Sequence, residues 1–150
     1  MSDLSPCHFY IRIEVIRDRP RRTLRLSQTA YLRKVLQDFD IKHCNDKIKT
    51  PMETSSRLMP TEPGYKADPK FRKQYQSAVG SLIYAMLSTR PDLAFTMSVI
   101  SRFSSNPTNA YWSTVKRIFR YIASTLDMSL MFRGELQPLE GYTDSDWAGD

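Results

Sequence analysis

The side chains best suited to metal chemistry are carboxylates near the end of the sequence. Asp144, Asp146 and Asp150 lie in this region, and residues 135–150 carry five acids and no base. Hard divalent cations prefer such oxygen ligands. The spacing has a weak likeness to a calcium loop, but the fifth position holds no acid and no glutamate follows. The acidic segment therefore fits either a metal site or simple solvation.

Other catalytic signatures are absent from the sequence. It contains no adjacent pair of aspartates, no Gly-rich phosphate loop, no nucleophile elbow and no zinc-ligand pattern. Cys7 and Cys44 have no motif spacing, which is typical of reduced thiols in an intracellular protein. Neither a signal peptide nor a transmembrane segment is recognisable, so we expect a cytoplasmic or nuclear protein with no membrane partner.

Basic residues point to a polyanionic partner. Residues 1–75 carry 16 Lys/Arg against 9 Asp/Glu, whereas residues 76–150 carry 6 against 7. Lys116, Arg117 and Arg120 are neighbours on one face of an expected helix, in a stretch without acids. Such a cluster can neutralise phosphates. A solvated helix face is an equally good interpretation.

The elements that would position these residues follow from hydrophobic periodicity. Residues 8–16 alternate between apolar and polar side chains, which predicts a strand. A charged turn at 17–22 and a short strand at 23–26 complete a β-hairpin. Ser27 is the expected N-cap of a helix that runs to Phe39. Residues 51–70, rich in proline, are the expected linker.

Three further helices and two strands are expected after the linker. The helices are predicted at 71–87, from Pro91, and after Asn106, with Asn106 as cap and Pro107 at the first helical position. Strands are expected at 128–132 and 139–143. These three helices and the helix before the linker all carry apolar stripes that predict core packing. The residues of these stripes are Tyr31, Leu32, Val35, Leu36, Phe39, Tyr75, Val79, Leu82, Met86, Leu93, Met97, Ile100, Phe103, Trp112, Val115, Phe119 and Ile122. The fold class is therefore α+β, mostly helical.

Several sequence words occur together in a family order. They are LSQTAYLRKVLQDFDI at 26–41, KTPM at 49–52, VGSLIY at 79–84, TRPDLAF at 89–95, SRFSSNP at 101–107, YW at 111–112, KRIFRYI at 116–122 and GYTDSDWAGD at 141–150. In this order and spacing they resemble the Pol polyprotein of copia-type LTR retrotransposons. The resemblance covers nearly the whole chain, from the end of reverse transcriptase into RNase H.

The resemblance implies contacts with a primer–template duplex. The hairpin at 9–26 resembles the primer grip, where the family usually has glycine at the position of Arg12. The helix at 71–87 resembles a thumb helix lying along the duplex. Gly80 would allow close approach to a sugar–phosphate backbone, and Tyr84 could pack on sugars or donate to a base edge or a 2′-OH. Tight helix–helix packing is the alternative role for Gly80.

The resemblance also divides the chain and assigns its acids. Residues 1–50 correspond to the end of the palm and a first thumb-like helix, 71–125 to a thumb or connection bundle, and 126–150 to the first strands of RNase H, expected as an exposed hairpin without other partners. Asp144 is the implied first RNase H carboxylate and a Mg²⁺ ligand in a complete domain. Because the remaining acids and the polymerase aspartates are absent, we expect no bound metal and no catalysis by this chain alone.

Three functions remain open on the sequence, of which the last is an enzyme in its own right, a metal-dependent nuclease acting on RNA–DNA hybrid through Asp144. The first is a retrotransposon fragment that binds RNA–DNA hybrid weakly and works with the rest of the Pol polyprotein. The second is a helical protein–protein interaction module derived from a transposon, which predicts exposed apolar surface on the helical stripes.

Overall fold

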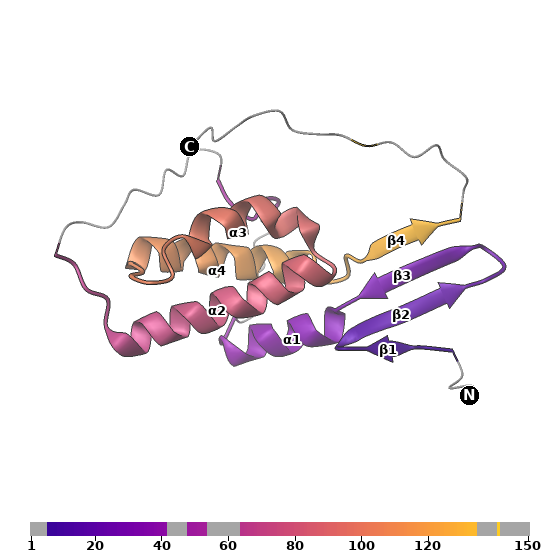
Figure 1. The fold of residues 1–150 in the computed structure, drawn as a ribbon, viewed down its shortest axis with the longest axis horizontal. Helices are drawn as coiled ribbons and strands as arrows, with labels where there is room; N and C mark the ends of the chain where they lie inside the picture. The colour runs from indigo at the N-terminus through magenta and orange to yellow at the C-terminus, as the bar shows by residue number, and fades with distance from the viewer. Residues whose placement is uncertain (1–5, 42–47, 54–63, 135–140, 142–150) are drawn as a thin grey trace.

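A computed structural model describes residues 6–41, 48–53, 64–134 and 141 of the chain. Within these residues, a bundle of helices carries a small sheet at one end, and the sheet extends away from the bundle (Figure 1). The mixed architecture confirms the predicted α+β class.

The sheet has four strands in the order β1-β2-β3-β4, each antiparallel to its neighbours. The strands are β1 (Phe9–Tyr10), β2 (Ile13–Asp18), β3 (Thr23–Ser27) and β4 (Leu130–Arg133). β4 pairs with β3 along the register Thr23 to Arg133 and Leu26 to Leu130. The expectation that strands after residue 126 would form a separate hairpin without other partners is therefore wrong for β4.

The predicted strand at 8–16 is interrupted by a turn. Tyr10 pairs with Ile13, so Ile11 and Arg12 form a two-residue hairpin loop. Both loop residues have positive φ, 44° and 59°. This conformation matches the twist of the strands on either side and is usually filled by Asn or Gly. The sequence did not predict this turn, because Ile11 and Arg12 continue the apolar–polar alternation and neither is a usual turn residue.

The helices begin close to the predicted positions, with two corrections. They are α1 (Thr29–Asp38), α2 (Pro69–Ser88), the short 3-10 helix η1 (Pro91–Leu93), α3 (Ala94–Ser101) and α4 (Asn109–Ser124). α2 starts two residues before the expected Phe71, because the Asp68 side chain accepts hydrogen bonds from the backbone N–H groups of Lys70 and Phe71.

The predicted caps of two helices are replaced by neighbouring residues. Thr108, and not Asn106, precedes α4. The Asn106 side chain instead holds the segment before α2, accepting from Ala67 N at 2.8 Å and donating to Tyr65 O at 2.7 Å. Ser27 ends β3, and Gln28 is the N-cap of α1, although Ser27 Oγ still accepts a hydrogen bond from Thr29 N at 3.3 Å.

The core lies between the helices and contains the predicted stripes. Phe119 of α4 is fully buried and stacks on Phe39 just after α1, with ring centroids 5.0 Å apart. Every residue of the predicted stripes is either buried in this core or packed against it. The stripe residues thus face the core, while Leu87 of α2 and Phe95 of α3, outside the stripes, are exposed.

Candidate nucleic-acid interface

Gly80 lies at an open position on the exposed side of α2. A Cβ built on Gly80 meets no atom within 4 Å among the described residues. Within the part of the chain that the structure describes, no helix packs tightly against Gly80, so the alternative role expected for this glycine is not seen there. A glycine inside a helix lowers stability by about 1 kcal/mol relative to alanine. No close packing contact at Gly80 among the described residues offsets this loss.

Tyr84, one turn after Gly80 on the same face of α2, ties the helix to the sheet. Its hydroxyl donates a hydrogen bond to the carbonyl oxygen of Ile11 in the β1–β2 turn. Its ring meets the edge of Tyr31 in α1, with centroids 5.0 Å apart and planes at 81°. The hydroxyl proton is thus already used within the fold, so a nucleic acid would meet the ring or a hydroxyl lone pair. The expected donation by this hydroxyl to a base or 2′-OH stays a prediction that requires the Ile11 bond to open.

Arg12 lies in the same turn, beside these two tyrosines. Its guanidinium carbon is 5.8 Å from the centroid of the Tyr31 ring, within reach of a cation–π interaction. Its φ of 59° falls in the left-handed region that favours glycine. The backbone thus explains why glycine suits this position, while the exposed arginine adds a charge next to the Gly80 face.

Tyr31 is a member of this site that sequence reasoning assigned only to the core. Its hydroxyl donates to the carbonyl of Ser81 in α2 at 3.1 Å. Burial raises the pKa of the Tyr31 hydroxyl, so this donor keeps its proton at neutral pH. The turn, α1 and α2 are therefore joined at one point by two tyrosines. No sequence signal separates Tyr31 from the other stripe residues.

The three basic residues predicted on α4 have different surroundings. Arg117 forms an ion pair with Glu53, with Nη1 and Oε1 2.7 Å apart, and donates to Thr50. Lys116 lies 6.0 Å from the centroid of the Trp112 ring. Arg120 is exposed. Glu53 thus partly neutralises the charge of Arg117. Lys116 and Arg120 are more accessible to an anionic ligand.

Lys116 of α4 lies away from the Tyr84 site. The ring of Trp112, which carries Lys116 above it, contacts Tyr75 near the start of α2 with centroids 6.4 Å apart. Tyr84 follows about 14 Å further along that helix, at a rise of about 1.5 Å per residue. The structure therefore brings Arg12, Gly80 and Tyr84 together and places Lys116 near the start of α2.

Arg90 and Asp92 form a structural ion pair. Arg90 is 1% exposed, donates to Asp92 Oδ2 at 2.8 Å and also donates to Thr125 Oγ1. Tyr121 donates its hydroxyl to the same carboxylate at 2.9 Å. Burial by itself raises the pKa of Asp92, but the hydrogen bonds and charge of Arg90 outweigh it and lower that pKa overall. The pair holds η1 against α4.

The predicted metal ligand Asp144 lies outside the described residues. Among the residues that are described, no group of three or more His, Cys, Asp or Glu side chains could hold a metal ion. The Mg²⁺ assignment therefore stays a prediction from the resemblance.

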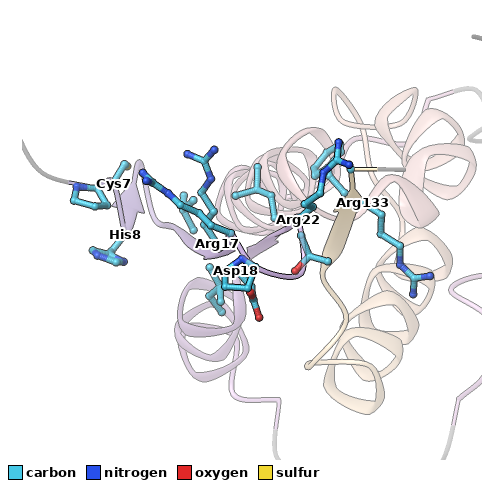
Figure 2. A pocket seen from close by; sticks show the side chains of 15 residues that line it. Cys7, His8, Arg17, Asp18, Arg22 and Arg133 are labelled. Atoms are coloured by element: carbon cyan, nitrogen blue, oxygen red, sulfur yellow. The ribbon is translucent and has the colours of Figure 1, made fainter. Parts of the chain in front are cut away.

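A basic groove that sequence reasoning missed lies at the far end of the sheet. It has a volume of about 1530 Å³, and its lining includes Arg17, Arg22 and Arg133 together with Asp18 (Figure 2). The sequence signal was present in the charged turn at 17–22. Its partner Arg133, however, is distant in sequence and joins it only through the β3–β4 pairing.

No helix in the described part of the chain has the length and apolar character needed to cross a membrane.

Comparison with known proteins identifies transposon relatives. The chain is 40% identical over 154 residues to the retrovirus-related Pol polyprotein from transposon TNT 1-94 of Nicotiana tabacum, a match that covers 100% of this chain and 11% of the polyprotein. The polyprotein from transposon RE2 of Arabidopsis thaliana is 34% identical over 144 residues, covering 95% of this chain and 9% of the polyprotein. A secreted RxLR effector protein 161 of Plasmopara viticola is 48% identical over 77 residues, which are 51% of this chain and 54% of the effector.

The chain thus spans about a tenth of the length of the transposon polyproteins and about half of the effector. No family model matches the sequence. No solved structure matches it significantly.

Proposed function

Starting from the homology of this chain to retrovirus-related Pol polyproteins of plant transposons, we propose that it supplies primer–template contacts to a reverse transcriptase. The contact surface is the exposed face of α2 around Gly80, bordered by the turn that carries Arg12. The ligand is an RNA–DNA hybrid or primer–template duplex, and the rest of the polyprotein is the working partner.

The open position of Gly80 carries this proposal. A helix face without a Cβ allows the backbone of a duplex strand to approach more closely than any other residue would permit. Ser77 is exposed one turn earlier and Lys73 two turns earlier on the same face, and Tyr84 follows one turn later. This row combines a cation, a small hydroxyl, a bare backbone and an aromatic ring. The composition suits the sugar–phosphate surface of a duplex, which is recognised largely by shape.

Arg12 adds electrostatic attraction at the border of this face. Its side chain is exposed, and its charge lies next to the aromatic pair that fixes the turn. A guanidinium there can donate two hydrogen bonds to one phosphate. The α4 cations Lys116, Arg117 and Arg120 are a second contribution, from another helix, that would strengthen binding at low salt.

The proposal is tested by titrating a fluorescein-labelled RNA–DNA hybrid with the full chain and following fluorescence anisotropy at several salt concentrations. We expect weak binding that falls steeply with salt. Gly80→Leu places a bulky side chain on the contact face and should weaken binding at least about tenfold, the effect of roughly 1.4 kcal/mol. Ser113→Leu adds comparable bulk at an exposed position of α4 and is the matched control. Equal affinities of the two variants would remove the α2 face from the proposal.

Catalysis belongs, in this proposal, to the complete polyprotein. DNA synthesis and hybrid cleavage need Mg²⁺ held by several carboxylates, and Asp144 is the single member of such a set that the resemblance assigns to this chain. We expect neither primer extension nor hybrid cleavage from the chain alone in Mg²⁺. Cleavage that disappears in Asp144→Asn would contradict this expectation.

A further inference from the structure

We propose that the groove at the β2–β3 turn binds a single-stranded nucleic-acid segment, with its phosphates on arginines and a base on Phe132. This site is separate from the α2 face and differs from it in ligand. The groove is lined by Arg17 and Arg22 of the hairpin and by Arg133 of β4 (Figure 2). Phe132 of β4 also lines it.

A row of three side chains crosses the sheet beside the groove. Arg17 pairs with Leu24, and Leu24 pairs with Phe132, so the three side chains lie on the same face of adjacent strands. The row therefore runs from a cation through an apolar residue to an aromatic ring. The Phe132 side chain is 51% exposed, which leaves ring surface available for stacking.

Arg22 is held beside this row by the backbone. Its carbonyl accepts a hydrogen bond from Gly134 N at 2.7 Å. A Cβ on Gly134 would lie 2.9 Å from Arg22 Cβ and 3.0 Å from its Nε, so the arginine side chain crosses directly over the glycine. Arg22 also has a φ of 50°, in the region that favours glycine. An arginine kept in this costly backbone conformation is a cation that the turn places at the groove.

The groove has a net positive charge among the described residues. Asp18 is the single acidic side chain that lines it. The carboxylate of Asp18 accepts a hydrogen bond from Arg21 N at 3.0 Å and lies 3.7 Å from Arg21 Nε. A neighbouring arginine thus already engages this acid, so the charges of Arg17, Arg22 and Arg133 are available to an anion.

The type of cation favours phosphate as the ligand. Residues 1–33 contain seven arginines and no lysine. The planar guanidinium binds a phosphate through two parallel hydrogen bonds, which lysine cannot do. Arginines alone would also suit an acidic peptide, but the exposed Phe132 ring on the same sheet face as Arg17 adds a stacking surface that a base uses. Cations that follow a strand backbone and an aromatic ring that stacks on a base are the combination found in single-strand binding grooves.

The test compares binding of fluorescein-labelled oligothymidylate by the full chain and its variants across a salt series. The groove variant combines Arg17→Ala, Arg22→Asn and Arg133→Ala, with asparagine at the positive-φ position because it tolerates that conformation. We expect its plot of log affinity against log salt to be about 2 units less steep, from about 0.7 per phosphate contact. The charge-matched control removes three exposed cations elsewhere, through Arg33→Ala, Lys34→Ala and Lys49→Ala, and should keep the slope.

Phe132 gives an independent readout. Phe132→Ala should weaken oligothymidylate binding about tenfold at constant salt slope, because it removes stacking and no charge. Phe132→Trp should restore it. An unchanged slope in the groove variant, or an affinity insensitive to Phe132, overturns the proposal. Displacement of the oligonucleotide by polyglutamate at equal charge concentration also overturns it, in favour of an acidic protein partner.

The outcome is distinguishable from that of the duplex proposal. Gly80→Leu should leave oligothymidylate binding unchanged while it weakens hybrid binding. Loss of the groove effect with retention of the Gly80 effect would remove the single-strand site alone. Circular dichroism of each variant confirms that the sheet and helices are intact.

Discussion

Asp92→Asn is the substitution for which the structure gives the sharpest stability prediction. The Arg90 guanidinium is 1% exposed, and its Nη2 lies 2.8 Å from an Asp92 side chain that is 27% exposed. Removing one partner of a buried ion pair leaves the other charge uncompensated and costs about 3–5 kcal/mol. Asp92 is partly exposed, and Arg90 keeps its hydrogen bond to Thr125 Oγ1 in the variant. We therefore expect the free energy of unfolding to fall by about 3 kcal/mol, the lower end of this range.

The pH dependence of stability provides a second readout of the same pair. The folded state lowers the pKa of Asp92 below its ordinary value of 3.8. The ionised carboxylate therefore contributes stability that is present above this value and is lost as the pH falls through the lowered pKa. The variant has no carboxyl group at residue 92 to titrate. The difference in free energy of unfolding between the two proteins should thus be largest at neutral pH and shrink in acid.

Urea unfolding followed by circular dichroism measures the free energy of unfolding of both proteins. Measurements at neutral pH and below about pH 3.8 give the loss caused by Asp92→Asn and its change with pH. Glu53→Gln is the control, because it removes an exposed ion pair whose partners are 30% and 56% exposed. Exposed pairs contribute about 0–1 kcal/mol. The reasoning would be refuted if Asp92→Asn lowered the free energy of unfolding no more than Glu53→Gln does. It would also be refuted if the difference in free energy of unfolding between Asp92→Asn and the unaltered protein were the same in acid as at neutral pH.

Three other substitutions test the fold. Arg12→Gly should raise the free energy of unfolding by up to about 1 kcal/mol, measured in urea, because glycine adopts the left-handed conformation without the Cβ penalty; destabilisation would mean that its contact with Tyr31 outweighs the strain. Asp68→Ala should cost about 1 kcal/mol by removing the cap of α2, and Asp68→Ser should recover most of it. Phe119→Ala should cost about 3–5 kcal/mol by leaving a cavity under α4, with thermal unfolding as the measurement and a shift of less than a few degrees as the contrary result.

The helices were predictable because their information is local. Apolar spacing identified the buried faces of all four α-helices, and every predicted stripe residue belongs to the core or packs on it. The cap of α2 was equally local, since Asp68 followed by Pro69 is a common helix start, but the expected start at Phe71 overlooked it.

The sheet was less predictable because its pairing is not local. Ile11 and Arg12 continue an apolar–polar alternation, yet they form a turn that usually requires Gly or Asn. β4 pairs with β3, roughly a hundred residues earlier, and nothing in the short apolar run at 128–132 specifies that partner. The basic groove was missed for the same reason, since Arg133 and Phe132 reach the hairpin only through this pairing.

The candidate site on α2 was found from Gly80 and Tyr84 but not from their partners. The resemblance identified both residues, whereas the roles of Tyr31 and the Ile11 carbonyl depend on three elements meeting at one point. Every residue has a backbone carbonyl, so the residue type at position 11 does not show that its carbonyl accepts a hydrogen bond. The sequence therefore identified the face of α2 but not the contact between Tyr84 and the Ile11 carbonyl that joins α2 to the sheet.

The pairing of β3 with β4 imposes an order on folding during synthesis. β3 leaves the ribosome long before β4, so its hydrogen-bonding edge stays open while the whole helical bundle is translated. An unpaired edge strand is a template for association with other chains. A product truncated before Leu130 would keep that edge permanently, and we expect it to aggregate where the full chain remains monodisperse in light scattering.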